Sequence, residues 1–337
     1  MIIQLHQDIS EQDRHVLNKI LSDNNIKTKE ISTQFNDYII GILSKEIDIR
    51  LIGNIKGVKD VHRVTDPYKL VSRKWKVNPT VIDLDDEVTI GENGFSLMAG
   101  PCSVESEEQI EKTAKQLIKN NVKIMRGGVF KPRSSPYAFR GLGIEGLKMF
   151  HSICKTHGIK IITEVMQVSQ IEEMIDYVDI FQVGARNTQN FNLLDALGKV
   201  DKPVMLKRGI SGTINELLQS AEYIFCAGNE KLLLCERGMR TYEKAYRNTF
   251  DINAIPILKE KSHLPVIADP SHGIGIRKHI ENISLSALAA GADGAMIEIH
   301  YEPEKAYSDG EQTINFEEFD KMVTRLNKLE KCLKETP

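Results

Sequence analysis

Eight short apolar stretches in the later part of the chain are each followed by side chains that could bind an anion, bind a metal ion or transfer a proton. Polar residues often follow an apolar stretch, because the chain leaves the core there. Ordinary surface positions would bring Ser, Asn and Thr as often, whereas these positions are rich in Arg, Lys and residues that can ligate metals. We therefore expect these side chains to meet in one site. In chain order they are Cys102, Arg126, Glu164, Arg186, Lys207, Glu236 with Arg237, Asp269 with His272, and Glu298.

One subset of these residues is basic, and the nearby Lys131 belongs with it. Cations gathered in one place repel one another unless an anion neutralises them, and guanidinium groups suit the oxygens of phosphates and carboxylates. Glu164 and Glu236 could pair with individual cations, but two carboxylates are too few for the whole subset. The pattern therefore predicts a substrate that carries phosphate and carboxylate groups. The subset is Arg126, Lys131, Arg186, Lys207 and Arg237.

A second subset could bind a divalent metal ion. One thiolate, one imidazole and two carboxylates form a mixed, borderline-soft ligand set that suits Mn2+, Fe2+, Co2+ or Zn2+. No short-range metal motif supports it, and a lone cysteine after Gly100 and Pro101 is often a small packed residue. The set is Cys102, His272, Glu298 and Asp309, with His300, Glu302 and Glu304 as competing ligands.

The elements that must position these residues alternate between strand and helix. Helical spacing occurs between the apolar stretches, at residues 107–119, 144–157, 168–177, 213–225 and 280–290. Such alternation predicts parallel strands joined by helices, and eight units in residues 95–337 fit a (β/α)8 TIM barrel, whose active site lies at the carboxyl ends of its strands. The eight expected strands are residues 95–99, 122–125, 159–163, 178–183, 203–206, 231–235, 265–268 and 294–297.

The first 66 residues predict a separate small α+β domain of the ferredoxin-like βαββαβ type. Its expected strands are residues 1–5, 28–33, 38–43 and 58–64, with one helix beginning after Ser10 and another over residues 45–52. Residues 67–94 follow as a linker with a short hairpin over residues 81–94. The predicted fold class is therefore α/β, with the small domain preceding the barrel.

Composition excludes several classes of protein. The chain has 337 residues and 44 Lys and Arg against 47 Asp and Glu, so its formal charge of −3 argues against a nucleic-acid binder. Its longest uncharged stretch, residues 93–104, is shorter than the roughly 18 residues of a membrane-spanning helix. We expect no secretion signal and a cytoplasmic protein whose five cysteines stay reduced.

Several motifs together resemble 3-deoxy-D-arabino-heptulosonate-7-phosphate (DAHP) synthases. The resemblance spans the whole barrel, and the leading domain is similar to the regulatory domain of the type I beta members. The motifs are Ala99-Gly100-Pro101-Cys102-Ser103-Val104-Glu105, Arg126-Gly127-Gly128, Lys131-Pro132-Arg133-Ser134-Ser135-Pro136, Ile161-Ile162-Thr163-Glu164, Gly184-Ala185-Arg186-Asn187, Leu206-Lys207-Arg208-Gly209, Cys235-Glu236-Arg237-Gly238 and Asp269-Pro270-Ser271-His272.

This resemblance implies a metal-dependent condensation of phosphoenolpyruvate with erythrose 4-phosphate, the first step of the shikimate pathway. It implies one divalent ion, most often Mn2+, and a homo-oligomer, commonly a tetramer. It also implies inhibition by tyrosine or phenylalanine bound to the small domain, which would close over or occlude the barrel mouth.

The resemblance also implies a role for individual residues. Glu164 would position or deprotonate water, and Lys131 would protonate the aldehyde oxygen. The implied ligands are Cys102, His272, Glu298 and Asp309 for the metal; Arg126, Lys131 and Lys207 for the phosphoenolpyruvate carboxylate; Arg186, Arg237 and the Ala185 N–H for its phosphate; and Pro132, Arg133, Ser134 and Asp309 for erythrose 4-phosphate.

Two alternatives remain at this point. The 3-deoxy-D-manno-octulosonate-8-phosphate (KDO8P) synthases share the barrel but use arabinose 5-phosphate, and they typically have Lys-Ala-Asn-Arg-Ser where this chain has Lys131-Pro132-Arg133-Ser134. They also lack an amino-terminal regulatory domain. The other alternative is a non-catalytic sensor of a phosphorylated metabolite, which the complete set of ligands and cations disfavours.

Overall fold

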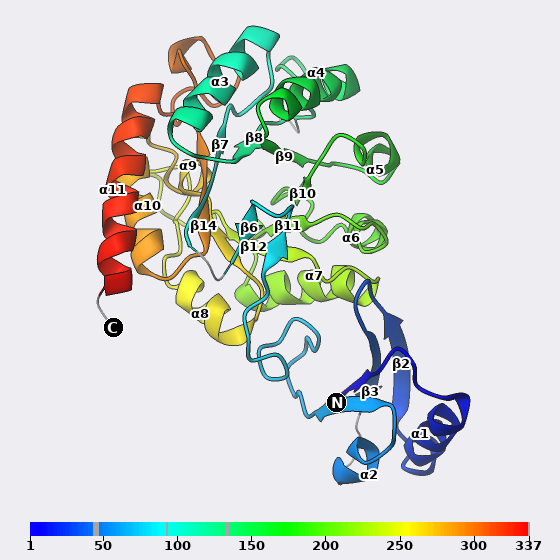
Figure 1. Cartoon of the computed structure of the whole chain (residues 1–337). Helices are drawn as coiled ribbons and strands as arrows, with labels where there is room; N and C mark the ends of the chain where they lie inside the picture. The colour runs from blue at the N-terminus through cyan, green and yellow to red at the C-terminus, as the bar shows by residue number, and fades with distance from the viewer. Residues whose placement is uncertain (43–46, 92–93, 132–134, 336–337) are drawn as a thin grey trace.

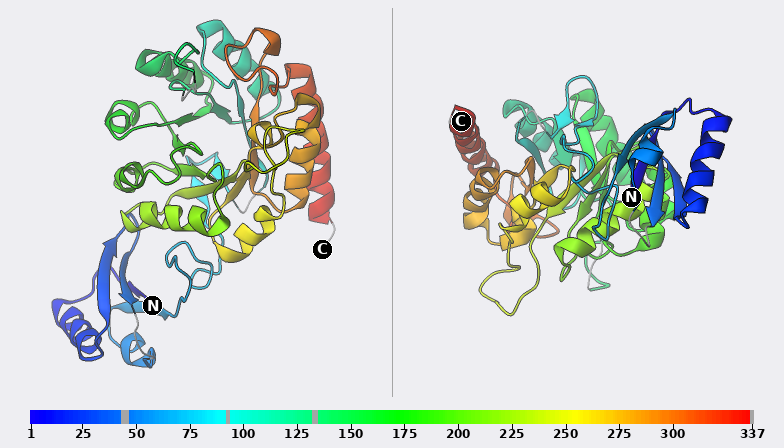
Figure 2. Two further views of the ribbon diagram at one scale, coloured as in Figure 1. Left: turned by 180° about the vertical axis from the view of Figure 1, so that it is seen from behind. Right: turned by 90° about the horizontal axis from the view of Figure 1, so that it is seen from below.

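The computed structural model describes residues 1–42, 47–91, 94–131 and 135–335. It consists of a closed barrel and a small domain that stands out from the side of the barrel (Figure 1, Figure 2). Within these residues no helix is both long and apolar enough to cross a membrane.

The barrel contains eight parallel strands in the order β10-β11-β12-β13-β14-β7-β8-β9, which confirms the predicted fold class. Each strand lies within two residues of its expected bounds. The strands are β7 (Ser96–Gly100), β8 (Ile124–Arg126), β9 (Lys160–Glu164), β10 (Ile180–Val183), β11 (Val204–Lys207), β12 (Leu232–Glu236), β13 (Val266–Ala268) and β14 (Gly294–Glu298).

Side chains from alternate positions of these strands fill the barrel interior. Met98, Ile162 and Leu233 belong to this inner cluster. The hairpin of β5 (Ile82–Asp83) and β6 (Thr89–Ile90) adds Ile82 and Ile90 to the same cluster. The interior is therefore a packed core, as in barrels whose site lies at the carboxyl ends of the strands.

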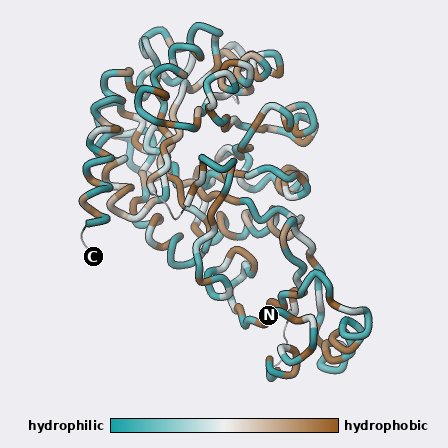
Figure 3. Tube along the Cα trace, viewed as in Figure 1, coloured by the Kyte–Doolittle hydropathy of each residue, from teal (hydrophilic) through white to brown (hydrophobic). Residues whose placement is uncertain are grey.

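Helices cover the outside of the barrel and alternate between hydrophilic and hydrophobic residues along their length (Figure 3), as helices with one buried face do. Side-chain caps fix where some begin: Ser106 caps α3, and Thr213 and Glu216 form a capping box on α7. The helices are α3 (Glu107–Lys119), α4 (Gly143–Thr156), α5 (Ser169–Met174), α6 (Phe191–Leu197), α7 (Ile214–Cys226), α8 (Ala254–Lys261), α9 (Pro270–Ile274), α10 (Ile280–Ala289) and α11 (Phe316–Glu335), with 3-10 turns at Arg277–His279 and Pro303–Lys305.

The small domain has the predicted βαββαβ order and an antiparallel sheet in the order β2-β3-β1-β4. The second helix begins later than expected, and residues 43–46 lie outside the described part of the chain. The elements are β1 (Ile2–Leu5), α1 (Glu11–Asp23), β2 (Lys27–Ser32), β3 (Asp37–Ile42), α2 (Arg50–Gly53) and β4 (Val58–His62).

The small domain contacts the barrel at the end opposite to the strand ends that carry the polar residues. Tyr38 packs edge-on against Trp75 of the linker and Phe225 of α7, with ring centroids 5.5 and 6.1 Å apart. Its hydroxyl donates to Glu230 at 3.0 Å, two residues before β12 begins. In this structure the domain therefore leaves the barrel mouth uncovered, and its closure over the mouth or occlusion of it when an aromatic amino acid binds stays a prediction.

Buried His263 joins the linker to the barrel and should make stability depend on pH. Its ring contacts Thr80 Oγ1 at 2.7 Å and the Leu70 carbonyl oxygen at 2.8 Å, and burial lowers its pKa to about 3. The unfolded imidazole takes up a proton below about pH 6.5 whereas the folded one stays neutral, so the free energy of unfolding should fall by about 1.4 kcal/mol per pH unit between these values. Denaturant unfolding of the wild type and His263→Gln at pH 7 and 5 checks this, and an equal pH effect in both proteins would contradict it.

Candidate active site

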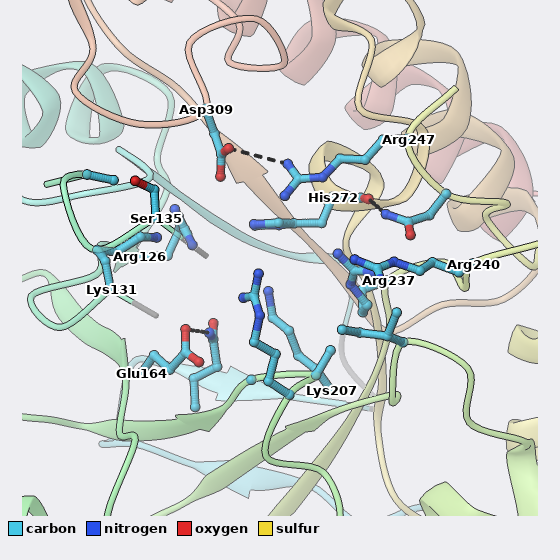
Figure 4. Close-up of a pocket in the computed structure, with 17 residues that line it drawn as sticks. Arg126, Lys131, Ser135, Glu164, Lys207, Arg237, Arg240, Arg247, His272 and Asp309 are labelled. Carbon is cyan, nitrogen blue, oxygen red and sulfur yellow. Dashed lines mark hydrogen bonds and ion pairs between the residues drawn. The ribbon is translucent and has the colours of Figure 1, made fainter. Parts of the chain in front are cut away.

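A pocket of about 430 Å3 opens at the carboxyl ends of the barrel strands (Figure 4). It brings together side chains from β8, β9, β11 and the loops after β10, β12, β13 and β14, as the strand-end pattern predicts. Nine of the predicted residues line it: Arg126, Lys131, Glu164, Ala185, Arg186, Lys207, Arg237, His272 and Asp309.

The predicted metal ligands lie together at one side of the pocket. Ligand atoms of Cys102, Glu298 and Asp309 are all within 4.8 Å of one another, and Cys102 Sγ lies 3.2 Å from Asp309 Oδ2. His272 Nε2 is 3.4 Å from Glu298 Oε1, so the imidazole faces the same group. One sulfur, one nitrogen and two carboxylates fit a borderline divalent ion such as Mn2+, Fe2+, Co2+ or Zn2+.

His272 is oriented by a buried carboxylate. Its Nδ1 lies 2.8 Å from Asp269 Oδ2, which leaves Nε2 directed toward Glu298. Burial opposes ionisation of Asp269, but His272 and Lys207 outweigh it and hold the pKa of this carboxyl well below its usual range. A carboxylate behind a histidine in this way is the common support of a metal-binding imidazole.

Burial and neighbouring charges shift the pKa values of all four metal-site side chains. Burial raises the pKa of the Cys102 thiol to about 11, and the neighbouring Glu298 adds to this shift. Burial disfavours the ionised form of Glu298 as well, but His272 and Arg126 outweigh it and its pKa is lowered. Because the thiolate is the form that binds metals, a cation at this position must displace the thiol proton.

Three of the predicted cations are held by groups of the site itself. Arg126 Nη1 lies 3.2 Å from Glu298 Oε1, Lys207 Nζ lies 2.5 Å from Asp269 Oδ2, and Lys131 Nζ lies 3.1 Å from Cys102 Sγ. Neither Glu164 nor Glu236 is their partner among the described residues: Glu236 pairs with Arg208 at 2.8 Å, and Glu164 accepts a hydrogen bond from Gln182 at 3.5 Å.

The other two predicted cations, Arg186 and Arg237, have no carboxylate partner among the described residues. Arg237 is only 7% exposed, and burial lowers its pKa. A buried guanidinium is costly without a counter-charge, so this part of the pocket favours an anionic ligand.

Other predicted residues are either outside the described part of the chain or absent from the metal-ligand group. Pro132, Arg133 and Ser134 are outside the described residues, although the following Ser135 lines the pocket. His300 stacks on Tyr301 and is absent from the metal-ligand group. The competing ligands Glu302 and Glu304 instead pair with Lys305 and Arg277.

The sequence interpretation missed five polar pocket residues: Ser135, Gln182, Arg240, Arg247 and Asn248. The last three belong to the long loop between β12 and α8. Their only sequence signal is the density of arginines after β12, where Arg237, Arg240 and Arg247 occur within eleven residues.

Comparison with known proteins now identifies the family. Residues 79–335 match the model of a family described as "DAHP synthetase I family". The chain belongs to the DAHP synthetase I family. It is 45% identical over 335 residues to the phospho-2-dehydro-3-deoxyheptonate aldolase of Thermotoga maritima. The aligned region covers 99% of this chain and 98% of that relative.

Solved structures agree with membership of the DAHP synthetase I family. The crystal structure of the Thermotoga maritima DAHP synthase is 44% identical, with a TM-score of 0.79 over 98% of this chain and 97% of that one. A truncated form of the Thermotoga maritima enzyme is 45% identical, with a TM-score of 0.74 over 79% of this chain and 97% of that one. A 2-dehydro-3-deoxyphosphooctonate aldolase from Syntrophobacter fumaroxidans is more distant, at 30% identity over 74% of this chain and 91% of the relative.

Proposed function

We propose that this protein is a DAHP synthase that condenses phosphoenolpyruvate with erythrose 4-phosphate and releases phosphate. The observation that carries the proposal is the pocket itself. Arg186 and Arg237 lack carboxylate partners among the described residues, and they share the pocket with Asp309 of the metal-ligand group and with His272, which faces Glu298 of that group. Family membership and the relative from Thermotoga maritima support the same reaction.

Two groups of cations in the pocket would bind the two charged ends of phosphoenolpyruvate. Arg186 and Arg237, with the backbone N–H of Ala185, would hold the phosphate. Arg126 and Lys131, which contact Glu298 and Cys102, would hold the carboxylate together with Lys207. Erythrose 4-phosphate would bind to Pro132, Arg133 and Ser134, with Asp309 beside its aldehyde end.

Cys102, His272, Glu298 and Asp309 would hold one divalent ion, for which Mn2+ is our first choice. Such an ion would act as a Lewis acid on the aldehyde of erythrose 4-phosphate. The cations that bind the carboxylate and the phosphate would then direct C3 of phosphoenolpyruvate toward C1 of the aldehyde.

Two residues of the pocket would transfer protons. Lys131 would protonate the aldehyde oxygen as the new bond forms, since its ammonium group lies beside Cys102 of the metal group. Water would then add at C2, positioned or deprotonated by Glu164, whose carboxylate faces the pocket and is held by Gln182 (Figure 4). The resulting hemiketal phosphate would lose inorganic phosphate.

Replacing Glu164 with glutamine should lower turnover by about 100-fold, because the amide keeps the shape but cannot accept the water proton. The KM for phosphoenolpyruvate should change little. Steady-state kinetics measure both values. Full turnover in Glu164→Gln would remove this role from Glu164.

The mass of the product tests the choice of substrate. The protein is incubated with Mn2+, phosphoenolpyruvate and either erythrose 4-phosphate or arabinose 5-phosphate. We expect only the seven-carbon sugar-acid phosphate. An eight-carbon product would assign the protein to the KDO8P synthases, and phosphoenolpyruvate binding without any product would indicate a sensor.

The small domain would bind tyrosine or phenylalanine and reduce activity. A variant beginning at Pro67 should remain active but lose most of this inhibition. The structure of a truncated Thermotoga maritima relative shows that a large part of such a chain can be studied alone. Initial rates with and without each amino acid test this, and equal inhibition of the variant and the full chain would contradict it.

We further propose that the enzyme acts in the cytoplasm as a homo-oligomer, a homotetramer as its family resemblance implies. Among the described residues Cys102, Cys154, Cys226 and Cys235 form no disulfide, which suits a reducing compartment. Light scattering of the purified protein measures the oligomeric state.

A further inference from the structure

The metal ligands are supported by a second layer of side chains that the proposed mechanism does not use. Gln312 is 3% exposed. Its amide nitrogen donates to Glu298 Oε2, and its amide oxygen accepts from Arg247 Nη1. Because a carboxylate only accepts and a guanidinium only donates, both partners require the same orientation of this amide. Gln312 thus links Arg247 to a predicted metal ligand.

Arg247 also contacts a second predicted ligand. Its Nη1 lies 3.5 Å from Asp309 Oδ1 (Figure 4). Asp309 has a φ of +51°, in the left-handed region that non-glycine residues rarely adopt. Its carbonyl oxygen accepts from Thr313 Oγ1 at 2.9 Å. The backbone is therefore fixed by the turn, whereas the carboxylate is held from the side by Arg247.

The loop that carries Arg247 is fastened to the third ligand as well. The neighbouring Asn248 donates from Nδ2 to the His272 carbonyl oxygen at 2.8 Å. The Asn248 backbone N–H donates to the Gly273 carbonyl oxygen at 3.1 Å. One loop thus contacts the segments of His272 and Asp309 directly, and that of Glu298 through Gln312.

The same loop begins at the anion-binding end of the pocket. Arg237 follows β12 directly, and Arg240 also lines the cavity. The Arg240 backbone N–H donates to the Ile210 carbonyl oxygen at 2.7 Å, which fixes this part of the loop to the turn after β11. An anion bound at Arg237 and a cation bound at Asp309 would therefore both constrain residues 237–248.

We propose that Arg247 and Gln312 are positioning residues that hold Asp309 and Glu298 for a divalent cation. Through them the arginine loop couples the phosphate end of the pocket to the metal end. This inference rests on the proposed function. By linkage, phosphoenolpyruvate tightens metal binding by the same factor by which the metal tightens phosphoenolpyruvate binding.

Calorimetric titration tests this coupling without measuring turnover. Mn2+ is titrated into chelator-treated full-length protein with and without phosphoenolpyruvate, and the ratio of the two Kd values gives the coupling factor. The variants are Arg247→Met and Gln312→Leu, which keep the length or shape of the side chain but lose its polar contacts. Lys244→Met is the matched control, because it removes one exposed positive charge from the same loop.

We expect Arg247→Met and Gln312→Leu to raise the Kd for Mn2+ by about 10- to 100-fold, the usual effect of losing a partner behind a metal ligand. Their coupling factor should fall toward one. Lys244→Met should match the wild type. Arg247→Lys, which keeps the charge but not the planar fork, should recover part of the affinity.

A spectroscopic measurement separates positioning from general damage to the fold. The thiolate-to-metal absorption of the Co2+-loaded protein reports the Cys102 environment, and it should change in Gln312→Leu while the thermal unfolding midpoint stays near that of the wild type. Unchanged Mn2+ affinity and an unchanged coupling factor in both variants would overturn this inference but not the proposed function. Failure of the wild type to bind Mn2+ or phosphoenolpyruvate would overturn the proposed function together with it.

Discussion

Replacement of Cys102 by alanine is expected to lower turnover by about 100-fold or more, since loss of even an outer partner of a metal ligand costs 10- to 100-fold. The thiol sulfur lies 3.2 Å from Asp309 Oδ2, and no other described residue offers a sulfur to the ligand group. Cys102 is 3% exposed, so alanine leaves a small gap in place of the softest ligand.

Metal binding and turnover should fail together in Cys102→Ala. Calorimetry with Mn2+ and metal analysis after dialysis measure the first, and loss of phosphoenolpyruvate absorbance measures the second. Cys226→Ala is the control, since Cys226 lies in α7 outside this pocket. Wild-type metal affinity in Cys102→Ala would show that the thiol is a packed residue and not a ligand.

Replacement of Lys131 by methionine is expected to lower turnover by about 1000-fold, within the range for loss of a general acid. Lys131 is 9% exposed, and its ammonium group donates to the Cys102 carbonyl oxygen at 3.0 Å. Methionine fills the same space without a proton to give. The affinity for phosphoenolpyruvate should also fall, because one carboxylate partner is lost.

Single-turnover kinetics separate the two losses in Lys131→Met. A slow chemical step at saturating substrates indicates the missing proton, whereas a normal step with weak binding indicates the missing carboxylate partner alone. Lys148→Met, on the exposed face of α4, is the control. Near-normal turnover in Lys131→Met would remove the proposed acid.

The barrel was predictable because each of its units is local. Apolar stretches such as residues 203–206 are short, and the segments between them have helical spacing, so both the strand and its polar end can be read from neighbouring residues. Closure of eight units then places Lys207 and Asp269 at the same end. The helix expected over residues 168–177 is shorter, because α5 ends at Met174 and Tyr177 forms a turn.

The pairing of side chains within the pocket was not predictable from the sequence. The Lys207–Asp269 and Arg247–Gln312 contacts join residues 62 and 65 positions apart. A strand pattern shows which end of the barrel a residue occupies, but the distance between two side chains depends on the whole ring of strands and on loop conformation. The sequence therefore places Asp269 at this end of the barrel but does not indicate its contact with Lys207.

The position of the small domain relative to the barrel was also not predictable from the sequence. Its strands and helix are set by local periodicity, whereas its attachment depends on contacts such as Tyr38–Glu230 between distant parts of the chain. The expected closure over the barrel mouth came from the family resemblance and not from any residue. In this structure the domain contacts the chain just before β12, away from the barrel mouth.

The most direct test of the proposed metal-dependent condensation follows phosphoenolpyruvate absorbance in the chelator-treated protein supplied with erythrose 4-phosphate. We predict no loss of absorbance until Mn2+ is added, followed by steady consumption with release of one phosphate per phosphoenolpyruvate. Equal turnover before and after Mn2+ addition, or none in its presence, would contradict the proposal.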